Sequence, residues 1–185
     1  ERVMGGTDKI ILDSTGNGST TAAAVDNGSS DACGIGGLSL SQTSFTCAQI
    51  GNNPVTLTVT DVNGNVSTCN ATVTVVDLVD PILTCPAPVT VQCPFNVPAV
   101  APGALSVSDN CDTSPTVTHV SDVVSSGSQP CVYVITRTYM AVDDSGNDTT
   151  CTQLITVHDT LAPVVTPPTN RTVEYGNSTL PAATG

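Results

Sequence analysis

Four landmarks near the end of one segment of the chain recur in the same order near the end of the next, at a single offset of 82 residues. Asp61, Cys69, Asp77 and Pro81 correspond to Asp143, Cys151, Asp159 and Pro163. The text between the landmarks also agrees, because both copies place Gly-Asn in the middle and Thr-Cys at the end. A fixed period with matching landmark residues indicates a tandem array of small modules. Such arrays usually link, space or bind, and seldom catalyse.

The module boundaries follow from Pro81 and Pro163, each of which comes after a predicted last strand and an Asp. Proline cannot continue a β-ladder, so it ends a module at these points. We expect residues 1–79 to form a first module that lacks its opening strand, residues 80–161 a complete second module, and residues 162–185 the start of a third. The connectors are short, so neighbouring modules should sit end to end with restricted bending.

Composition indicates modules that need covalent support. Aromatic residues make up 3% of the chain and Trp is absent, so each core must be built from small aliphatic side chains. A module of about 80 residues with such a core is marginally stable. Eight cysteines can supply disulfides, which imply an oxidising compartment and therefore an exported, extracellular chain. Zinc binding is not favoured, because the chain has no Cys-x-x-Cys pair and neither His has a second ligand nearby.

The net charge of −12 excludes several partners. A surface with this charge repels nucleic acid and anionic lipid. The chain also has no run of about 18 apolar residues, so we expect no membrane insertion. It opens on no signal peptide, and we expect the export signal to lie outside this stretch.

Alternating apolar and polar residues predict strands through most of the chain. Residues 55–60 and 69–75 alternate, and Asn63-Gly64 between them suits a tight hairpin turn. Further strands are expected at residues 38–40, 44–47, 89–92, 104–108, 116–120 and 132–142. Short strands separated by regular turn signals predict an all-β fold of tandem immunoglobulin-like antiparallel β-sandwich modules, stapled by disulfides.

Several motifs together resemble a known family. Residues 108–115, 134–139, 143–147, 151–153 and 159–163 resemble hyalin-repeat (HYR) modules. Residues 26–34 and 61–69 of the first module resemble the variant in giant repetitive adhesins of gliding Gram-negative bacteria, which the type IX system secretes. The resemblance implies an immunoglobulin-like fold and a role in cell adhesion, gliding motility or surface spacing. The chain departs from the pattern at Ser145, where such modules commonly carry Cys, and this leaves Cys93 without its expected partner. We expect Cys93 to be an inert buried thiol rather than a reactive one.

The positions of the other cysteines suggest a disulfide plan. Cys85 near the first strand and Cys151 in the last would staple the two ends of the second module. By the same logic Cys69 should pair with a cysteine upstream of residue 1. The remaining predicted pairs are Cys33 with Cys47 and Cys111 with Cys131, although parity alone permits other pairings.

Acidic loops suggest a calcium site. Fourteen of the sixteen acids are Asp, which suits turns and hard-cation sites. Each Asp-rich hairpin is by itself more often a solvated turn, but in an immunoglobulin-like sandwich these loops meet the entering connector at one pole. Convergent carboxylates repel one another unless a cation offsets their charge. The predicted Ca²⁺ ligands at the junction of the modules are Asp77, Asp80, Asp109, Asp112, Asp143, Asp144 and Asn147, with Asp77, Asp80, Asp109 and Asp143 leading. An equivalent site in the first module would use Asp26, Asp31 and Asp61 with an upstream connector.

Other chemistry is poorly represented. No Ser or Thr lies in a nucleophile elbow, and we expect the protein not to be an enzyme. Asp159-Thr160-Leu161 resembles the O-glycosylation signal of the same bacterial group, which makes Thr160 a candidate glycosylation site.

The leading functional hypothesis is a non-enzymatic stalk or adhesive segment of a long extracellular surface adhesin or filament. The rival hypothesis is a set of spacer modules in a secreted multidomain enzyme. Direct sugar binding is a third option, disfavoured by the scarcity of aromatic platforms. Expected partners are neighbouring modules of the same chain, and beyond them surface polysaccharide or other surface proteins. Edge strands in such sandwiches also allow lateral self-association.

Overall fold

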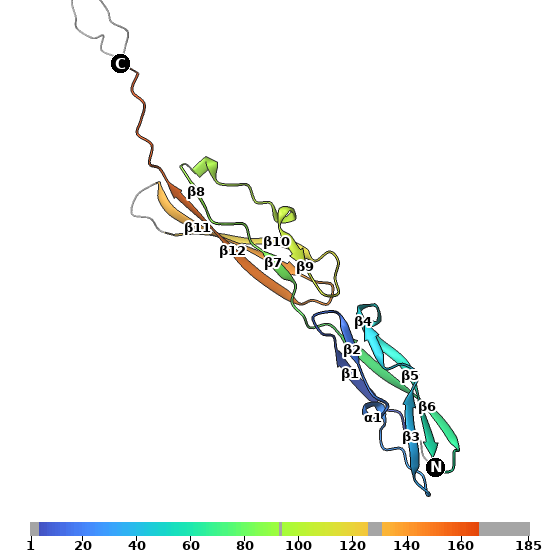
Figure 1. Ribbon diagram of the computed structural model, residues 1–185. Helices are drawn as coiled ribbons and strands as arrows, with labels where there is room; N and C mark the ends of the chain where they lie inside the picture. Colours follow the sequence, from blue (N-terminus) through green and yellow to red (C-terminus); the bar gives the residue numbers. More distant parts are fainter. Residues whose placement is uncertain (1–3, 93, 126–130, 167–185) are drawn as a thin grey trace, which may run out of the picture.

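The computed structural model describes residues 4–92, 94–125 and 131–166 and shows two β-sandwich modules arranged end to end (Figure 1). The strands of the first module are β1 (Thr7–Ile11), β2 (Asn17–Ser19), β3 (Ile35–Leu40), β4 (Ser44–Thr46), β5 (Gly51–Asp61) and β6 (Val66–Val76). Those of the second are β7 (Ile82–Thr84), β8 (Val89–Val91), β9 (Ser106–Ser108), β10 (Thr116–Val124), β11 (Val132–Val142) and β12 (Asp148–His158). Short helices are α1 (Ala22–Val25) and the 3-10 turns η1 (Cys47–Gln49), η2 (Pro94–Asn96) and η3 (Pro102–Ala104). The predicted all-β fold of tandem sandwich modules is confirmed.

The first module is built around the long hairpin of β5 and β6. Its larger sheet has the strand order β1-β6-β5-β3, and β2 pairs with β4 in a smaller sheet. The alternation in the sequence places Val55, Leu57 and Val59 of β5 inside, as predicted, and each is at most 3% exposed. From β6, Val73 and Val75 face the same core.

The second module repeats the larger sheet with different side chains, whereas the smaller sheets differ, because β2 follows the edge strand β1 in the chain and β7 precedes the edge strand β8. Its larger sheet has the order β10-β11-β12-β8, and β7 pairs with β9. Each larger sheet has one parallel pair at its edge, because β1 runs parallel to β6 and β8 runs parallel to β12. Asp8 lies opposite Val73 as Val89 lies opposite Ile155. The period seen in the sequence is therefore also a period in the three-dimensional structure.

Most predicted strands are present, and the differences have local causes. The range 132–142 is that of β11, and β10 runs four residues beyond the predicted 116–120. The strand expected at 104–108 begins only at Ser106, because Pro102 starts the 3-10 turn η3. The short strands β1, β2 and β7 were not predicted, since they are too brief or too irregular to alternate.

The disulfides confirm one predicted pair and correct two. Cys85 and Cys151 are bonded, with their Cα atoms 5.7 Å apart, and staple the second module as expected. Cys47 is bonded to Cys111 of the other module, with a Cα–Cα distance of 5.2 Å. The predicted pairs Cys33–Cys47 and Cys111–Cys131 are therefore wrong.

The length of the central strands explains both errors. Cys33 lies near the end of β5, because Ile35 pairs with Asp61, whereas Cys47 lies before the start of β5. A strand of 11 residues separates these positions by roughly 30 Å, far beyond the roughly 7 Å that a disulfide allows between Cα atoms. Strand β11 separates Cys111 from Cys131 in the same way.

The predicted module boundaries at 79/80 and 161/162 stay predictions. Most of the predicted third module, and Cys93, lie outside the described residues. Across the stretches that the structure describes, no helix has both the length and the apolar character needed to cross a membrane.

Candidate metal centre between the modules

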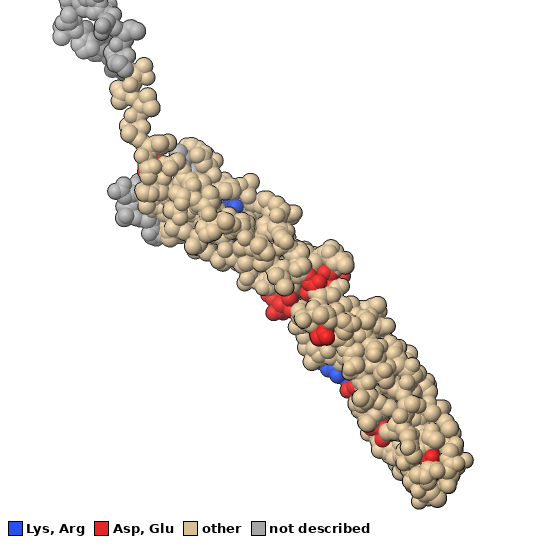
Figure 2. Space-filling view, viewed as in Figure 1, with Lys and Arg blue, Asp and Glu red and all other residues tan. Residues whose placement is uncertain are grey.

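Acidic side chains gather where the two modules meet (Figure 2). We call this region the joint. It comprises the connector, residues 77–81, together with the loops that touch it from each module. From the second module these are the β9–β10 loop and the β11–β12 hairpin, which carry Asp109 and Asp143. The acidic loops of the second module therefore meet the connector at one pole of the sandwich, as predicted.

Three carboxylates form the centre of the joint. Asp77, Asp109 and Asp143 each offer an oxygen, and these oxygens all lie within 4.8 Å of one another. Asp77 is 4% exposed and Asp143 is 6% exposed, and Asp109 is half-buried. Three negative charges at this separation and burial repel strongly. Both salt bridges among the described residues involve Asp122, so neither neutralises the cluster.

Local turns aim the three carboxylates. The backbone N–H of Val79 donates to Asp77 Oδ1 at 3.1 Å. The N–H of Cys111 donates to Asp109 Oδ2 at 2.8 Å. The backbone and side-chain amides of Asn147 donate to the two oxygens of Asp143, at 2.8 and 2.7 Å. Each Asp side chain thus accepts a hydrogen bond from a backbone N–H two to four residues later, which is a common turn arrangement for Asp.

Three side-chain oxygens remain buried without a hydrogen-bond donor among the described residues: Asp77 Oδ2, Asp109 Oδ1 and Asn110 Oδ1. A buried acceptor without a partner carries a desolvation cost of about 1–3 kcal/mol, more if charged. Calcium binds oxygen ligands at about 2.3–2.6 Å, so ligands on opposite sides of the ion lie about 5 Å apart. The separations in the cluster and the all-oxygen chemistry both fit a hard divalent cation. The unpaired oxygens of Asp77, Asp109 and Asn110 are the ligand atoms that such a cation could use.

Asn110 was missed by the sequence reasoning. Its Nδ2 donates to the carbonyl of Asp13 in the first module at 3.1 Å and to Asp77 Oδ1 at 3.2 Å. The side chain thus bridges the two modules and the connector. The available signal was an amide directly after Asp109, a second oxygen donor in the same loop.

The other predicted residues at the joint lie around the cluster. Asp80 is exposed and lines a cavity of about 260 Å³ together with Asp109 and Asn110. Asp112 Oδ2 accepts the backbone N–H of Asp144 at 3.1 Å and so ties the two acidic loops together. Asn147 Nδ2 lies 3.4 Å from the carbonyl oxygen of Asp77.

The site predicted for the first module is not assembled among the described residues. Asp61 accepts the side-chain amide of Asn65 at 2.7 Å and its N–H at 2.8 Å, as Asp143 does from Asn147, but Asp26 and Asp31 do not join Asp61 in a cluster of possible metal ligands. The Asn65 side-chain bond is the main cause that lowers the pKa of Asp61. Asp26 binds Ser29, whose side-chain hydroxyl is the main cause that lowers the pKa of Asp26. Asp31 accepts from the N–H of Cys33 at 2.8 Å. A metal site here stays a prediction that needs a connector before residue 1.

The inter-module disulfide lies directly beside the cluster. Cys111 follows Asn110, and Cys47 Sγ lies 3.4 Å from the carbonyl oxygen of Asn110. Gly16 packs against the sulfur, because a Cβ at this position would come within 2.4 Å of Cys47 Sγ. The joint therefore combines a covalent link, a bridging amide and an acidic cluster within a few residues.

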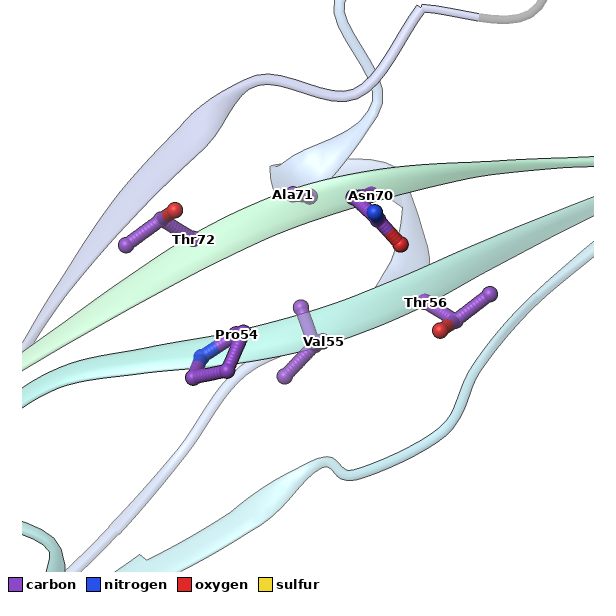
Figure 3. A pocket seen from close by; sticks show the side chains of 6 residues that line it. All are labelled: Pro54, Val55, Thr56, Asn70, Ala71 and Thr72. Atoms are coloured by element: carbon purple, nitrogen blue, oxygen red, sulfur yellow. The ribbon is translucent and has the colours of Figure 1, made fainter.

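Another hollow lies between β5 and β6 of the first module (Figure 3). It has a volume of about 240 Å³ and is lined by Pro54, Val55, Thr56, Asn70, Ala71 and Thr72. None of these lining side chains titrates, so the hollow offers no acid, base or charged ligand group.

Together the sheets and the joint define a pair of linked immunoglobulin-like β-sandwich modules. No family model and no curated protein matches the chain. The hyalin-repeat resemblance therefore rests on the motifs quoted above.

Solved structures with a similar chain path are extracellular regions of protocadherins. They include protocadherin gamma B7 domains 1–4, with 15% identity, a TM-score of 0.30 and coverage of 84% of this chain and 51% of that one. Mouse PcdhgC3 EC1–3 has 13% identity, a TM-score of 0.31 and coverage of 83% and 65%. Human mucin-like protocadherin EC1–2 has 12% identity, a TM-score of 0.29 and coverage of 84% and 97%. The chain spans from about a third to a half of the first three matched structures. At these scores the likeness carries no argument about function.

Proposed function

We propose that this chain is a non-enzymatic segment of an extracellular stalk, in which a locked joint holds successive modules in line. The carrying observation is the joint, where a disulfide joins residues from different modules next to three clustered carboxylates. A rigid link between two small sandwiches suits a spacer or an adhesive fibre, whose modules must stay in line. The hyalin-repeat motifs support placement in a large surface adhesin of the gliding-bacterial type.

The second part of the proposal is that Ca²⁺ binds at the joint. Asp77, Asp109 and Asp143 would be the charged ligands, and Asn110 would add its amide oxygen. Asp80 can complete the shell from the cavity side, where it lines the same space as Asp109. The ion would offset the repulsion among the carboxylates and join the connector to both acidic loops of the second module. We also propose that the exposed Thr160 carries an O-linked glycan, as its sequence context suggests.

Calorimetric titration of the chain with CaCl₂ tests the metal site. We expect one equivalent of Ca²⁺ to bind and to raise the melting temperature, since a ligand that binds only the native state stabilises it. Asp109→Asn removes one charged ligand and should weaken binding at least about tenfold.

Asp148→Asn is the matched control, because it removes the same charge from an exposed residue near the hairpin. It should change the affinity less than about twofold. Equal losses in the two variants would point to general charge attraction and not to a site. The absence of heat and of thermal stabilisation in the unaltered chain would overturn the calcium proposal.

A further inference from the structure

The two cysteines of the Cys47–Cys111 disulfide each have a counterpart at one of the two outer poles of the molecule. Cys33 and Cys131 are exposed, and neither has a disulfide partner among the described residues. Cys33 lies at the outer pole of the first module, where β5 ends. Cys131 lies at the outer pole of the second, where β11 begins.

Cys33 occupies the position in the first module that Cys111 occupies in the second. Each follows an Asp by two residues, and each donates its backbone N–H to that carboxylate at 2.8 Å. Each also precedes the strand that pairs with the central hairpin, and these strands share a register: Leu38 lies opposite Val59 as Val117 lies opposite Ala141. Asp31 and Asp61 thus stand where Asp109 and Asp143 stand in the joint.

Cys131 lies at the same end of the second module as Cys47 does in the first module. Cys47 comes shortly before β5, and Cys131 directly precedes β11. Beside Cys131, Asp159 repeats the turn of Asp77. The N–H of Leu161 donates to Asp159 Oδ1 at 3.0 Å, as that of Val79 donates to Asp77 Oδ1 at 3.1 Å. The N–H of Asp159 also donates to the carbonyl of Cys131 at 3.3 Å.

We propose that the two poles are complementary halves of a repeated joint, whose partner is another module of this same type. Cys131 bonds to the cysteine at the Cys33 position of the module that follows. Cys33 bonds to the cysteine at the Cys131 or Cys47 position of the module that precedes. Asp159 meets the counterparts of Asp31 and Asp61 at the same interface. A lone surface thiol would not support this proposal. Here each outer pole carries both the cysteine and the acidic residues that are found together in the joint between the two modules, where the Cys47–Cys111 disulfide has formed.

The covalent step needs an oxidant, and an exported protein meets one as a disulfide of a small thiol or of a dithiol oxidoreductase. The two cysteine thiols lose two protons and two electrons and form one S–S bond. The oxidant's disulfide takes up both and becomes two thiols. An open head-to-tail contact of this kind propagates along a fibre and does not close on itself.

The inference deepens the proposed stalk function and rests on its tandem arrangement, but it does not require a metal ion. Its test uses a polypeptide that joins residue 163 of one copy directly to residue 1 of a second, complete copy. The parallel strands determine where the copies are joined. Val89 and Asp8 have the same place in the register of their sheets, so residue 82 corresponds to residue 1. Residue 163 corresponds to residue 81 by the sequence period, so residue 1 follows it as residue 82 follows residue 81. Cys33→Ser in the first copy and Cys131→Ser in the second leave one cysteine of each type, both at the new joint.

After refolding in a glutathione redox buffer, non-reducing peptide mapping by mass spectrometry should find Cys131 of the first copy linked to Cys33 of the second. The Cys47–Cys111 link within each copy reports correct folding. Replacing the remaining Cys131 by Ser should abolish the new link and expose one more thiol to maleimide. Cys69→Ser in both copies should leave it intact, because Cys69 is a half-buried residue within β6.

Formation of Cys47–Cys111 in both copies without the new link would overturn the inference. A link from Cys131 to another cysteine of its own copy would do the same. The mapping is repeated in EDTA, where the link should persist. A failed calcium titration with an intact link would refute only the metal site, whereas a bound ion without the link would refute only the repeated joint.

Discussion

One inward position of the second module carries a charge. Arg137 is on the core face of β11 and 3% exposed, and the same position in the first module is Val55. Its guanidinium donates to both oxygens of Asp122 and, at 2.8 Å, to the carbonyl of Pro98. The Arg137 hydrogen bond is the main cause that lowers the pKa of Asp122 to about 2. The buried cation is therefore paired, as a thin aliphatic core requires.

Asp122→Asn should destabilise the chain by about 2–3 kcal/mol, because it leaves Arg137 buried and without its counter-charge. The pKa of Asp122 is lower in the folded state than its ordinary 3.8. The stability that this pair contributes is therefore complete above about pH 4 and is lost as the pH falls toward 2. Urea unfolding at pH 7 and pH 2.5 should show a large difference between the two proteins at pH 7 that shrinks at pH 2.5. A difference that does not change with pH would contradict the role of the ion pair.

At the scale of elements, the two long hairpins use the same turn. Asp61 and Asp143 each accept the N–H of the Asn four residues later, and Gly64 and Gly146 each have a φ of +89°. The Asp and Asn residues of these two hairpins are thus explained by the geometry of the turn. Only at the joint do a connector and a second loop add the carboxylates of a candidate metal site to this turn.

Gly146→Ala should destabilise the second module by about 1–2 kcal/mol, since a side chain is strained at a left-handed φ even though open space surrounds it. Gly103→Ala is the matched control, because Gly103 also faces open space but has no positive φ. Its effect on thermal unfolding should be within about 0.5 kcal/mol of zero. Equal effects of the two substitutions would show that the turn geometry does not matter for stability.

At the scale of the whole molecule, the modules form an elongated rod with the joint at its middle (Figure 1). The connector, the Cys47–Cys111 disulfide and the Asn110 bridge all cross this point. Domains joined by a single short linker move relative to each other by default. Here several independent contacts oppose that motion.

NMR relaxation should therefore find one common axis and rate of tumbling for both modules of the unaltered chain in Ca²⁺. Cys111→Ser in EDTA removes the covalent link and any bound ion together, and the modules should then tumble with separate, shorter correlation times. Cys69→Ser in Ca²⁺ controls for the loss of a cysteine and should behave like the unaltered chain. Independent tumbling of the unaltered chain would contradict a locked joint.

Features that depend on local spacing could be predicted from the sequence alone. Its period predicted two equivalent modules, alternation identified the inward residues of β5 and β6, and the positions of Cys85 and Cys151 at the module's ends predicted their bond. The convergence of Asp77, Asp109 and Asp143 also followed, because the entering connector and two loops share one pole in such a sandwich. These inferences need only the direction of each strand and the face of each side chain.

The pairing of the cysteines and the oxygens left without a donor could not be predicted, because they depend on how the two modules stack. Cys33 and Cys47 are near in sequence, but an 11-residue strand holds them at opposite poles. Cys47 and Cys111 are separated by 64 positions, yet the stacking of one module on the next brings them together. The bridge from Asn110 to Asp13 depends on the same stacking. Strand periodicity describes a residue's place within its own module, whereas contacts across the joint depend on how two rigid bodies fit, which no local pattern encodes.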